Sequence, residues 1–327
     1  MRECPTRRLR TVTGMSYTRR LACTVVVSLL MVVGVASLSS AATSALHNPA
    51  ANIAATPDIF SSGTCTGSAG SYTCTNPCVS SRLTWPLHDN GQTCTLYVLA
   101  AINHARGTLH EPALVLPTNW YTLSVAQQLF VMADMERVGD GYPAYLGLNV
   151  HLSAATQKAA AHGSDPSVAA GFSVGDNADG GAAMGGSWSE GLNVLEADYV
   201  WMYDDGWGGS TAATSNIVCT SATSLGCWAH RDELLGSDPK FNLGVGLHCR
   251  TCEMGAAYST HGGVSNYVDL IEFPKGKPPA MTFTWAHERR YFRGGVPYTT
   301  GPTTTTTLVP VSTTTTTTLA PGPTTTT

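Results

Sequence analysis

The order of secondary-structure patterns along the middle of the chain constrains its fold more than any other feature. Between residues 92 and 297, stretches with apolar residues at helical spacing come first, and short runs rich in Val, Ile, Tyr and Phe follow them. Helices are predicted at 94–106, 123–138, 152–163, 193–206 and 229–236, and strands at 242–249, 254–260, 266–273 and 280–286. Helices followed by strands favour an α+β fold over a parallel α/β sheet.

The first 45 residues have the pattern of a secretory signal peptide. Arg19 and Arg20 precede the apolar run "LACTVVVSLLMVVGVASL", and small polar residues follow it. The run is also nearly long enough to span a bilayer, so a retained signal anchor is an alternative and would be the one predicted contact with a membrane. We therefore expect a protein that is secreted or displayed at the cell surface.

The charge of the chain changes when this leader is set aside. The leader holds six of the 18 basic residues and one of the 22 acidic residues, which leaves 12 and 21, a balance of -9. Binding to phosphate groups needs clustered Lys and Arg, and no such cluster occurs in the sequence. A nucleic-acid partner is therefore not expected.

Two segments that flank the middle region lack the composition of a folded core. Residues 46–91 are rich in Ser, Thr, Gly and Cys, and we interpret them as an irregular extension pinned by disulfides. Residues 298–327 are dominated by Thr and Pro, with too few large apolar residues to bury a core, so they are predicted to form a disordered stalk or linker. The folded domain is expected between them, at 92–297.

Eight cysteines remain beyond the leader: Cys65, Cys74, Cys78, Cys94, Cys219, Cys227, Cys249 and Cys252. An even number of cysteines in an exported chain indicates disulfides. The simplest pairing joins sequence neighbours, as 65–74, 78–94, 219–227 and 249–252. The "CRTC" at 249–252 is also compatible with a redox pair or with half of a zinc site, although the second CxxC of a typical structural zinc site does not occur.

No motif of the common secreted hydrolases is complete in this sequence. The G-x-S-x-G of a nucleophile elbow is absent, and "HEPAL" and "HERRY" begin like a zinc-protease helix but lack its second histidine. These absences make an enzyme less expected without excluding one.

Five motifs occur in order over about residues 120–260. They read "MERVGDGYPAYLGLNVHLSAATQKAAAHG", "WSEGLN", "YVWMYDDG", "CWAHRDELLG" and "FNLGVGL". In this order they resemble the CAP superfamily of cysteine-rich secretory, antigen-five and pathogenesis-related proteins, and in particular its secreted members of actinobacterial type. The best match is the family's "HR..IL" helix, at His230, Arg231, Leu234 and Leu235. The resemblance implies a CAP-type α-β-α sandwich.

The resemblance also implies a cleft in which two histidines and two acidic residues hold a divalent cation such as Zn²⁺. Carried over residue by residue, the motifs assign Glu190, Asp204 and His230 to this site, with His162 as the second histidine and His151 as a weaker substitute. Neutral imidazoles bind Zn²⁺, and carboxylates add charge or orient the ligands.

Each of these side chains also has a structural explanation. His230 fits a first-turn residue bonded to nearby backbone, and His162 fits a cation at a helix end. Glu190 fits a loop residue before the helix at 193–206. Asp204 lies near the end of that helix, where the helix dipole disfavours an acid, but the neighbouring Asp205 indicates plain solvation of both carboxylates. Arg231 is expected to be structural and paired with an acid.

Three functions remain open at this level. The predicted stalk favours an extracellular binding module whose ligand is a lipid, a sterol, a peptide or a cell-wall component. The first alternative is a metal-assisted or His/Glu-dependent hydrolase of peptide or envelope substrates, since a metal with an open position lowers the pKa of its bound water to about 7. The second alternative is a surface scaffold with a vestigial site.

Overall fold

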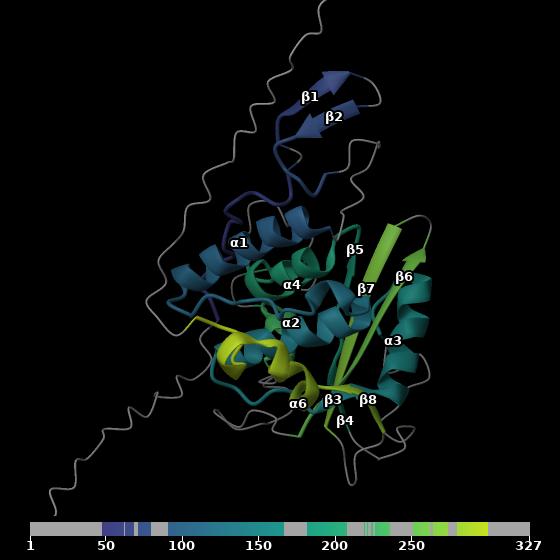
Figure 1. The fold of residues 1–327 in the computed structure, drawn as a ribbon. Helices are drawn as coiled ribbons and strands as arrows, with labels where there is room; N and C mark the ends of the chain where they lie inside the picture. Colours follow the sequence, from purple (N-terminus) through teal and green to yellow (C-terminus); the bar gives the residue numbers. More distant parts are fainter. Residues whose placement is uncertain are drawn as a thin grey trace, which may run out of the picture. The chain divides into compact units, whose positions relative to one another are not determined.

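The fold is a mixed β-sheet with helices packed on both of its faces (Figure 1). The computed structural model describes residues 48–61, 63–68, 71–79, 91–166, 182–207, 219, 221, 224, 226–235, 251–261, 264–273 and 280–299. These residues all belong to one unit, Thr43–Thr327.

Helices and strands are interleaved along the chain, whereas the sequence pattern indicates helices first and strands later. The described helices are α1 (Gln92–Thr108), η1 (Trp120–Thr122), α2 (Val125–Gly139), α3 (Val150–His162), α4 (Val194–Tyr203), α5 (Ala229–Leu234), α6 (Trp285–Glu288), η3 (Arg289–Tyr291) and η4 (Arg293–Gly295). The strands are β1 (Cys65–Ser68), β2 (Ser71–Cys74), β3 (Gly147–Asn149), β4 (Ala182–Gly185), β5 (Trp188–Glu190), β6 (Glu253–His261), β7 (Val264–Phe273) and β8 (Met281–Thr284). The predicted α+β class is confirmed.

Strands β6 and β7 form the centre of the sheet as an antiparallel pair. The strand order is β4-β7-β6-β3-β8, and β5 also pairs with β7. Strand β3 runs parallel to β6, whereas the other described pairs are antiparallel. The sheet is therefore mixed.

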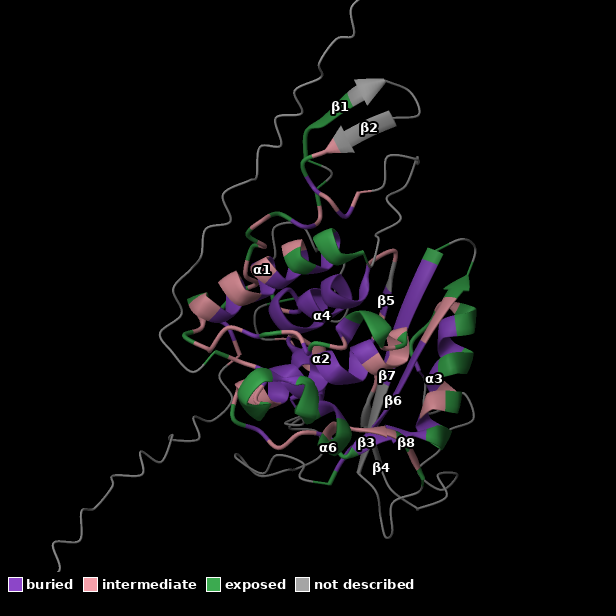
Figure 2. Cartoon of the chain, viewed as in Figure 1, coloured by how far each residue is buried: buried purple, intermediate pink, exposed green. Residues whose placement is uncertain are grey.

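Successive residues of β6 face opposite helical layers, as the two-residue period of a strand requires. Met254 and Ala256 belong to the large core cluster that also contains α1, α2 and α4. Ala257 packs with Ala159 and Ala160 of α3 on the other face. Figure 2 shows the consequence, because α4 is buried along its whole length whereas α3 has one buried and one exposed side.

The predicted helices agree with the structure except at their ends. Helix α3 stops where Gly163 adopts a left-handed conformation (φ 61°), which is common for a glycine that follows a helix. Helix α4 begins with a capping box between Asn193 and Glu196 but ends at Tyr203, three residues before the predicted end. This early end matters for the site, because the residues after Tyr203 leave the helix.

The later strands also follow the prediction in part. Strands β6 and β7 cover the predicted runs 254–260 and 266–273, whereas β8 ends at Thr284 and the chain turns into α6 within the predicted run 280–286. The short strands β3, β4 and β5 were not predicted. The predicted strand at 242–249 lies outside the described residues.

The segment before α1 contains regular structure where an irregular extension is expected. Strands β1 and β2 form an antiparallel ribbon, with Cys65 opposite Cys74. Upstream of the ribbon, Ile53 donates its backbone N–H to the carbonyl of Tyr203 at 2.9 Å, and the Tyr199 hydroxyl donates to the carbonyl of Ile53 at 2.8 Å. This part of the chain therefore packs against α4.

Three of the four predicted disulfides are confirmed, namely Cys65–Cys74, Cys78–Cys94 and Cys219–Cys227. Cys252 is disulfide-bonded as well, and its predicted partner Cys249 lies outside the described residues. Disulfides of this kind are compatible with an extracellular location.

The predicted leader and most of the Thr/Pro-rich segment lie outside the described residues. Among the helices that the structure does describe, none combines the length and apolar character needed to cross a membrane.

Candidate functional site

Helix α5 carries His230. The residues that follow His230 in the sequence fix the helix to the rest of the domain. Arg231 donates to the backbone carbonyl of Met202 at 3.0 Å and to Glu111 Oε1 at 3.1 Å. Leu234 and Leu235 are buried in the core. The structural role expected for Arg231 is confirmed, and α5 is held in one position.

The acid that binds Arg231 belongs to a buried network of charges. Arg106 contacts Glu111, Glu136 and Asp140 and also lies within 3.3 Å of the Tyr203 hydroxyl. Burial, with a smaller contribution from the charge of Asp140, raises the pKa of Glu111 to about 7 against the opposing charges of Arg106 and Arg231. The network joins α1, α2 and α4, and it is connected to α5 through Arg231.

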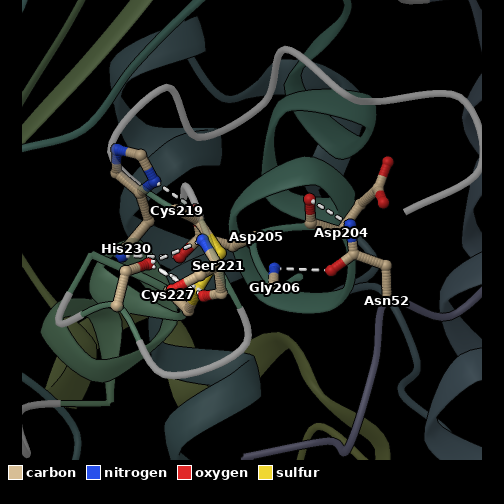
Figure 3. Close-up of a disulfide and its surroundings, with 9 residues drawn as sticks. Asn52, Asp204, Asp205, Gly206, Cys219, Ser221, Cys227 and His230 are labelled. Carbon is tan, nitrogen blue, oxygen red and sulfur yellow. Dashed lines mark hydrogen bonds and ion pairs between the residues drawn. A yellow bond between two sulfur atoms is a disulfide. The ribbon is translucent and has the colours of Figure 1, made fainter. Parts of the chain in front are cut away.

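His230 forms a close pair with Asp205 (Figure 3). The imidazole Nδ1 lies 2.7 Å from Asp205 Oδ1, and the backbone N–H of His230 donates to Asp205 Oδ2 at 2.9 Å. The carbonyl of Asp205 accepts the N–H of Trp228 at 2.9 Å, and Trp228 has a positive φ of 62°. Asp205 thus binds both the side chain and the first turn of α5, and it orients the ring so that Nε2 is left for another partner.

Two further carboxylates lie close enough to His230 to affect its charge. Burial alone lowers the pKa of His230, but the hydrogen bond and charge of Asp205 and the charges of Asp269 and Asp165 outweigh burial, so its pKa lies above the ordinary value. Its side chain keeps 19% of its surface exposed. The charges of three acids therefore act on the imidazole: Asp165 shortly after α3, Asp205 shortly after α4, and Asp269 in strand β7.

Asp269, like Asp205, has no exposed surface. Its Oδ1 accepts the N–H of Ser187 at 2.9 Å, whereas its Oδ2 has no hydrogen-bond partner among the described residues. Burial raises the pKa of Asp269 to about 7. A buried carboxyl oxygen without a hydrogen-bond partner is costly, and a bound ligand is one way to offset that cost.

The structure places the predicted ligand Asp204 beside this group, not in it. Asp204 caps the C-terminal end of α4, and in Figure 3 its side chain points away from His230. Burial raises its pKa to about 7. The residue that binds His230 is the next one, Asp205.

The other predicted ligands differ in how far the structure describes them. His162 is exposed on the last turn of α3, where its Nδ1 lies 2.7 Å from the carbonyl of Lys158, as its structural explanation requires. His151 is exposed at the start of the same helix. The backbone of Glu190 ends β5 and pairs with Asn266, whereas its side chain lies outside the described atoms.

Among the described residues, one group of three ligand side chains has its ligand atoms within 4.8 Å of one another, and it is Cys78, Cys94 and Glu196. Its two sulfurs are joined in a disulfide, and Glu196 Oε2 accepts the N–H of Asn193 at 2.8 Å. This group is suited to a metal only after reduction, because the thiolate is the ligand form of cysteine. His230, Asp204 and His162 form no such group, and the four-residue site stays a prediction.

Sequence reasoning missed Asp165, Asp205 and Asp269. Asp205 had a visible signal, since it adjoins Asp204 in "YDDG", but its role depends on where α4 ends. Asp165 and Asp269 lie far from His230 in the sequence, and only folding brings their charges close enough to affect it.

Comparisons with family models, with curated proteins and with solved structures find no match to this chain.

Proposed function

We propose that the chain is an extracellular binding module of CAP type, and that His230, Asp205, Asp165 and Asp269 form its cation-dependent ligand site. Two independent features support the CAP type: the order of the five sequence motifs, and an α+β fold with helices on both faces of a mixed sheet. Three disulfides support export to an oxidising compartment. The lipid, sterol, peptide or cell-wall ligand expected from the resemblance belongs to the same proposal.

The observation that carries the proposal is the His230–Asp205 pair. A histidine whose Nδ1 is bonded to a carboxylate presents Nε2 in the orientation that metal-binding histidines usually have. Three carboxylates beside one imidazole also favour a cation over an anion. The residues supply the donor types and the charge of a cation site, although their ligand atoms do not all lie within 4.8 Å of one another.

Calorimetric titration of the exported protein with Zn²⁺ tests the proposal. We expect binding at micromolar metal that His230→Ala abolishes and that Asp205→Asn weakens roughly 10- to 100-fold, as the loss of an orienting carboxylate does. His261→Ala is a control matched to His162→Ala, because both histidines are exposed and bonded through Nδ1 to a backbone carbonyl. If the wild-type protein does not bind Zn²⁺, the proposed cation site is wrong. The function that remains is then a surface scaffold with a vestigial site.

The same titration separates the two ligand sets. If His162→Ala weakens binding as strongly as His230→Ala, the histidine pair inferred from the resemblance forms the site. If His162→Ala behaves like the His261→Ala control, the set centred on Asp205 is supported.

A second candidate function is a hydrolase, and the hydrogen bond between His230 and Asp205 favours it. A carboxylate that fixes one imidazole nitrogen prepares the other for general acid–base work. This function requires turnover of a peptide or envelope substrate that disappears in His230→Ala and, under the family's assignment, in Glu190→Gln.

A further inference from the structure

We infer that Asn52 is a positioning residue for the His230 site and that its side-chain amide sets the place of Asp205. This inference rests on the proposed function, because it names what holds the central carboxylate of the proposed ligand site. Asn52 lies in the segment before the β1–β2 ribbon, more than 150 positions before Asp205. The sequence predicts only an irregular extension for that segment.

Asn52 forms hydrogen bonds with the residue before Asp205 and with the residue after it. Its Nδ2 donates to the backbone carbonyl of Asp204 at 3.1 Å, and its Oδ1 accepts the backbone N–H of Gly206. One planar amide therefore satisfies the residue before Asp205 and the residue after it, as Figure 3 shows. Asp204 is the C-cap of α4. Asp205 and Gly206 therefore lie beyond the helix and are not held by its hydrogen bonds.

The neighbouring contacts leave this arrangement little freedom. A Cβ atom at Gly206 would collide with the ring of Trp228 and come within 2.7 Å of Asn52 Oδ1. The same Trp228 donates its backbone N–H to the carbonyl of Asp205. Asp205 is thus fixed from the α5 side by Trp228 and from the opposite side by Asn52.

The position of Asp205 in turn affects the imidazole of His230. Asp205 Oδ1 lies 2.7 Å from His230 Nδ1, a distance at which a small displacement of the carboxylate lengthens or breaks the hydrogen bond. Without that bond the ring is free to adopt the other neutral tautomer, with the proton on Nε2. Asn52 then decides which nitrogen of His230 is available to a ligand.

The chain contains a matched control within the same segment. Asn48 also joins this segment to α5, by donating to Asp232 Oδ1 at 3.0 Å, but among the described residues it makes no hydrogen bond to Asp204, Asp205 or Gly206. A substitution at Asn48 loosens the segment without removing the amide that encloses Asp205.

The test is the tautomer of His230 in nitrogen-labelled protein without added metal, read from long-range proton–nitrogen correlation spectra at a pH where the imidazole is neutral. We expect the Nδ1–H tautomer in the wild type. In Asn52→Ala we expect the ratio of Nδ1–H to Nε2–H to fall by roughly fivefold, the effect of about one lost hydrogen bond. In Asn48→Ala the ratio stays as in the wild type.

Asn52→Asp provides a second variant should Asn52→Ala fail to fold, because it keeps the acceptor for Gly206 and removes the donor to Asp204. A folded Asn52 variant with the wild-type ratio overturns the inference. An equal change in Asn48→Ala also overturns it, since the effect would then belong to the whole segment. The readout needs no metal, so it stands apart from a failure of the wild-type protein to bind Zn²⁺.

Discussion

At the scale of single residues, Gly206 shows how closely the chain packs at the end of α4. The ring of Trp228 and the amide of Asn52 occupy the space where a side chain at this position would lie. Gly107, in the last turn of α1, is the opposite case, since a Cβ there would meet no atom within 4 Å. The two glycines therefore have different reasons for being glycine.

This difference predicts opposite effects of the same substitution. Gly206→Ala should destabilise the protein by about 1–3 kcal/mol, because the added methyl group forces the Trp228 ring or Asn52 to move. Gly107→Ala should leave stability unchanged or raise it by up to about 1 kcal/mol, since alanine favours a helix more than glycine does. Equilibrium unfolding in urea measures both. Equal stability of the two variants would show that the Trp228 ring does not restrict position 206.

At the scale of elements, the Cys78–Cys94 disulfide joins the segment after β2 to the start of α1. Both sulfurs are buried, and Asn193, the N-cap of α4, donates to Cys94 Sγ at 2.8 Å. The Cys65–Cys74 disulfide instead closes the β1–β2 ribbon on itself. One disulfide therefore belongs to the core and the other to a local ribbon.

The two disulfides should differ in what their removal does. Replacing Cys78 and Cys94 with alanine should lower the free energy of unfolding by about 3 kcal/mol, the loop-closure contribution for a separation of 16 residues. Replacing Cys65 and Cys74 should leave the main transition nearly unchanged and raise hydrogen exchange only in the ribbon. Denaturant unfolding and amide exchange check the two outcomes. A larger loss of stability from the ribbon pair would contradict this assignment.

The elements found from sequence and those missed differ in how much of their stability is local. Helices α1 to α5 have their own apolar spacing or caps, such as the capping box at Ser124, and they were predicted. Strands β3 and β5 have three residues each, and they form only because β6 and β7, far along the chain, pair with them. A three-residue strand has too few positions to show a period.

The candidate site follows the same rule. His230 was predicted because it lies in a motif, and the order of the motifs is visible in sequence. Asp205 was not predicted as its partner, because α4 ends at Tyr203, earlier than its apolar spacing indicates, and this end turns Asp205 towards α5. Asn52 could not be predicted at all, since its contacts with Asp204 and Gly206 exist only in the folded chain.

At the scale of the whole molecule, buried carboxyl groups give the protein a common response to pH. Burial raises the pKa of Glu111, Asp204 and Asp269 to about 7 in each case, and it also raises the pKa of Asp134 and Glu136. A carboxyl whose pKa is higher in the folded state than in the unfolded state binds its proton more tightly when folded. The folded state should therefore be favoured at mildly acidic pH.

Glu111 allows this response to be tested at one position. Its pKa rises from an ordinary 4.5 to about 7 on folding, so between these values the folded state holds more protons than the unfolded state. Stability should fall as the pH rises through this window, and the part due to Glu111 should be on the order of 1–3 kcal/mol. Above pH 7 this contribution is constant.

Glu111→Gln should reduce this slope, because the amide has the shape of the protonated acid and does not titrate. Near pH 5 the variant should be about as stable as the wild type, and near pH 8 it should be the more stable of the two unless its lost contact with Arg231 outweighs the gain. Urea unfolding at a series of pH values measures the slope. A lost contact with Arg231 shifts the stability by a constant amount and does not change the slope. An unchanged slope between pH 4.5 and 7 would mean that Glu111 is already ionised in the folded protein, held by Arg106 and Arg231 against the cost of burial.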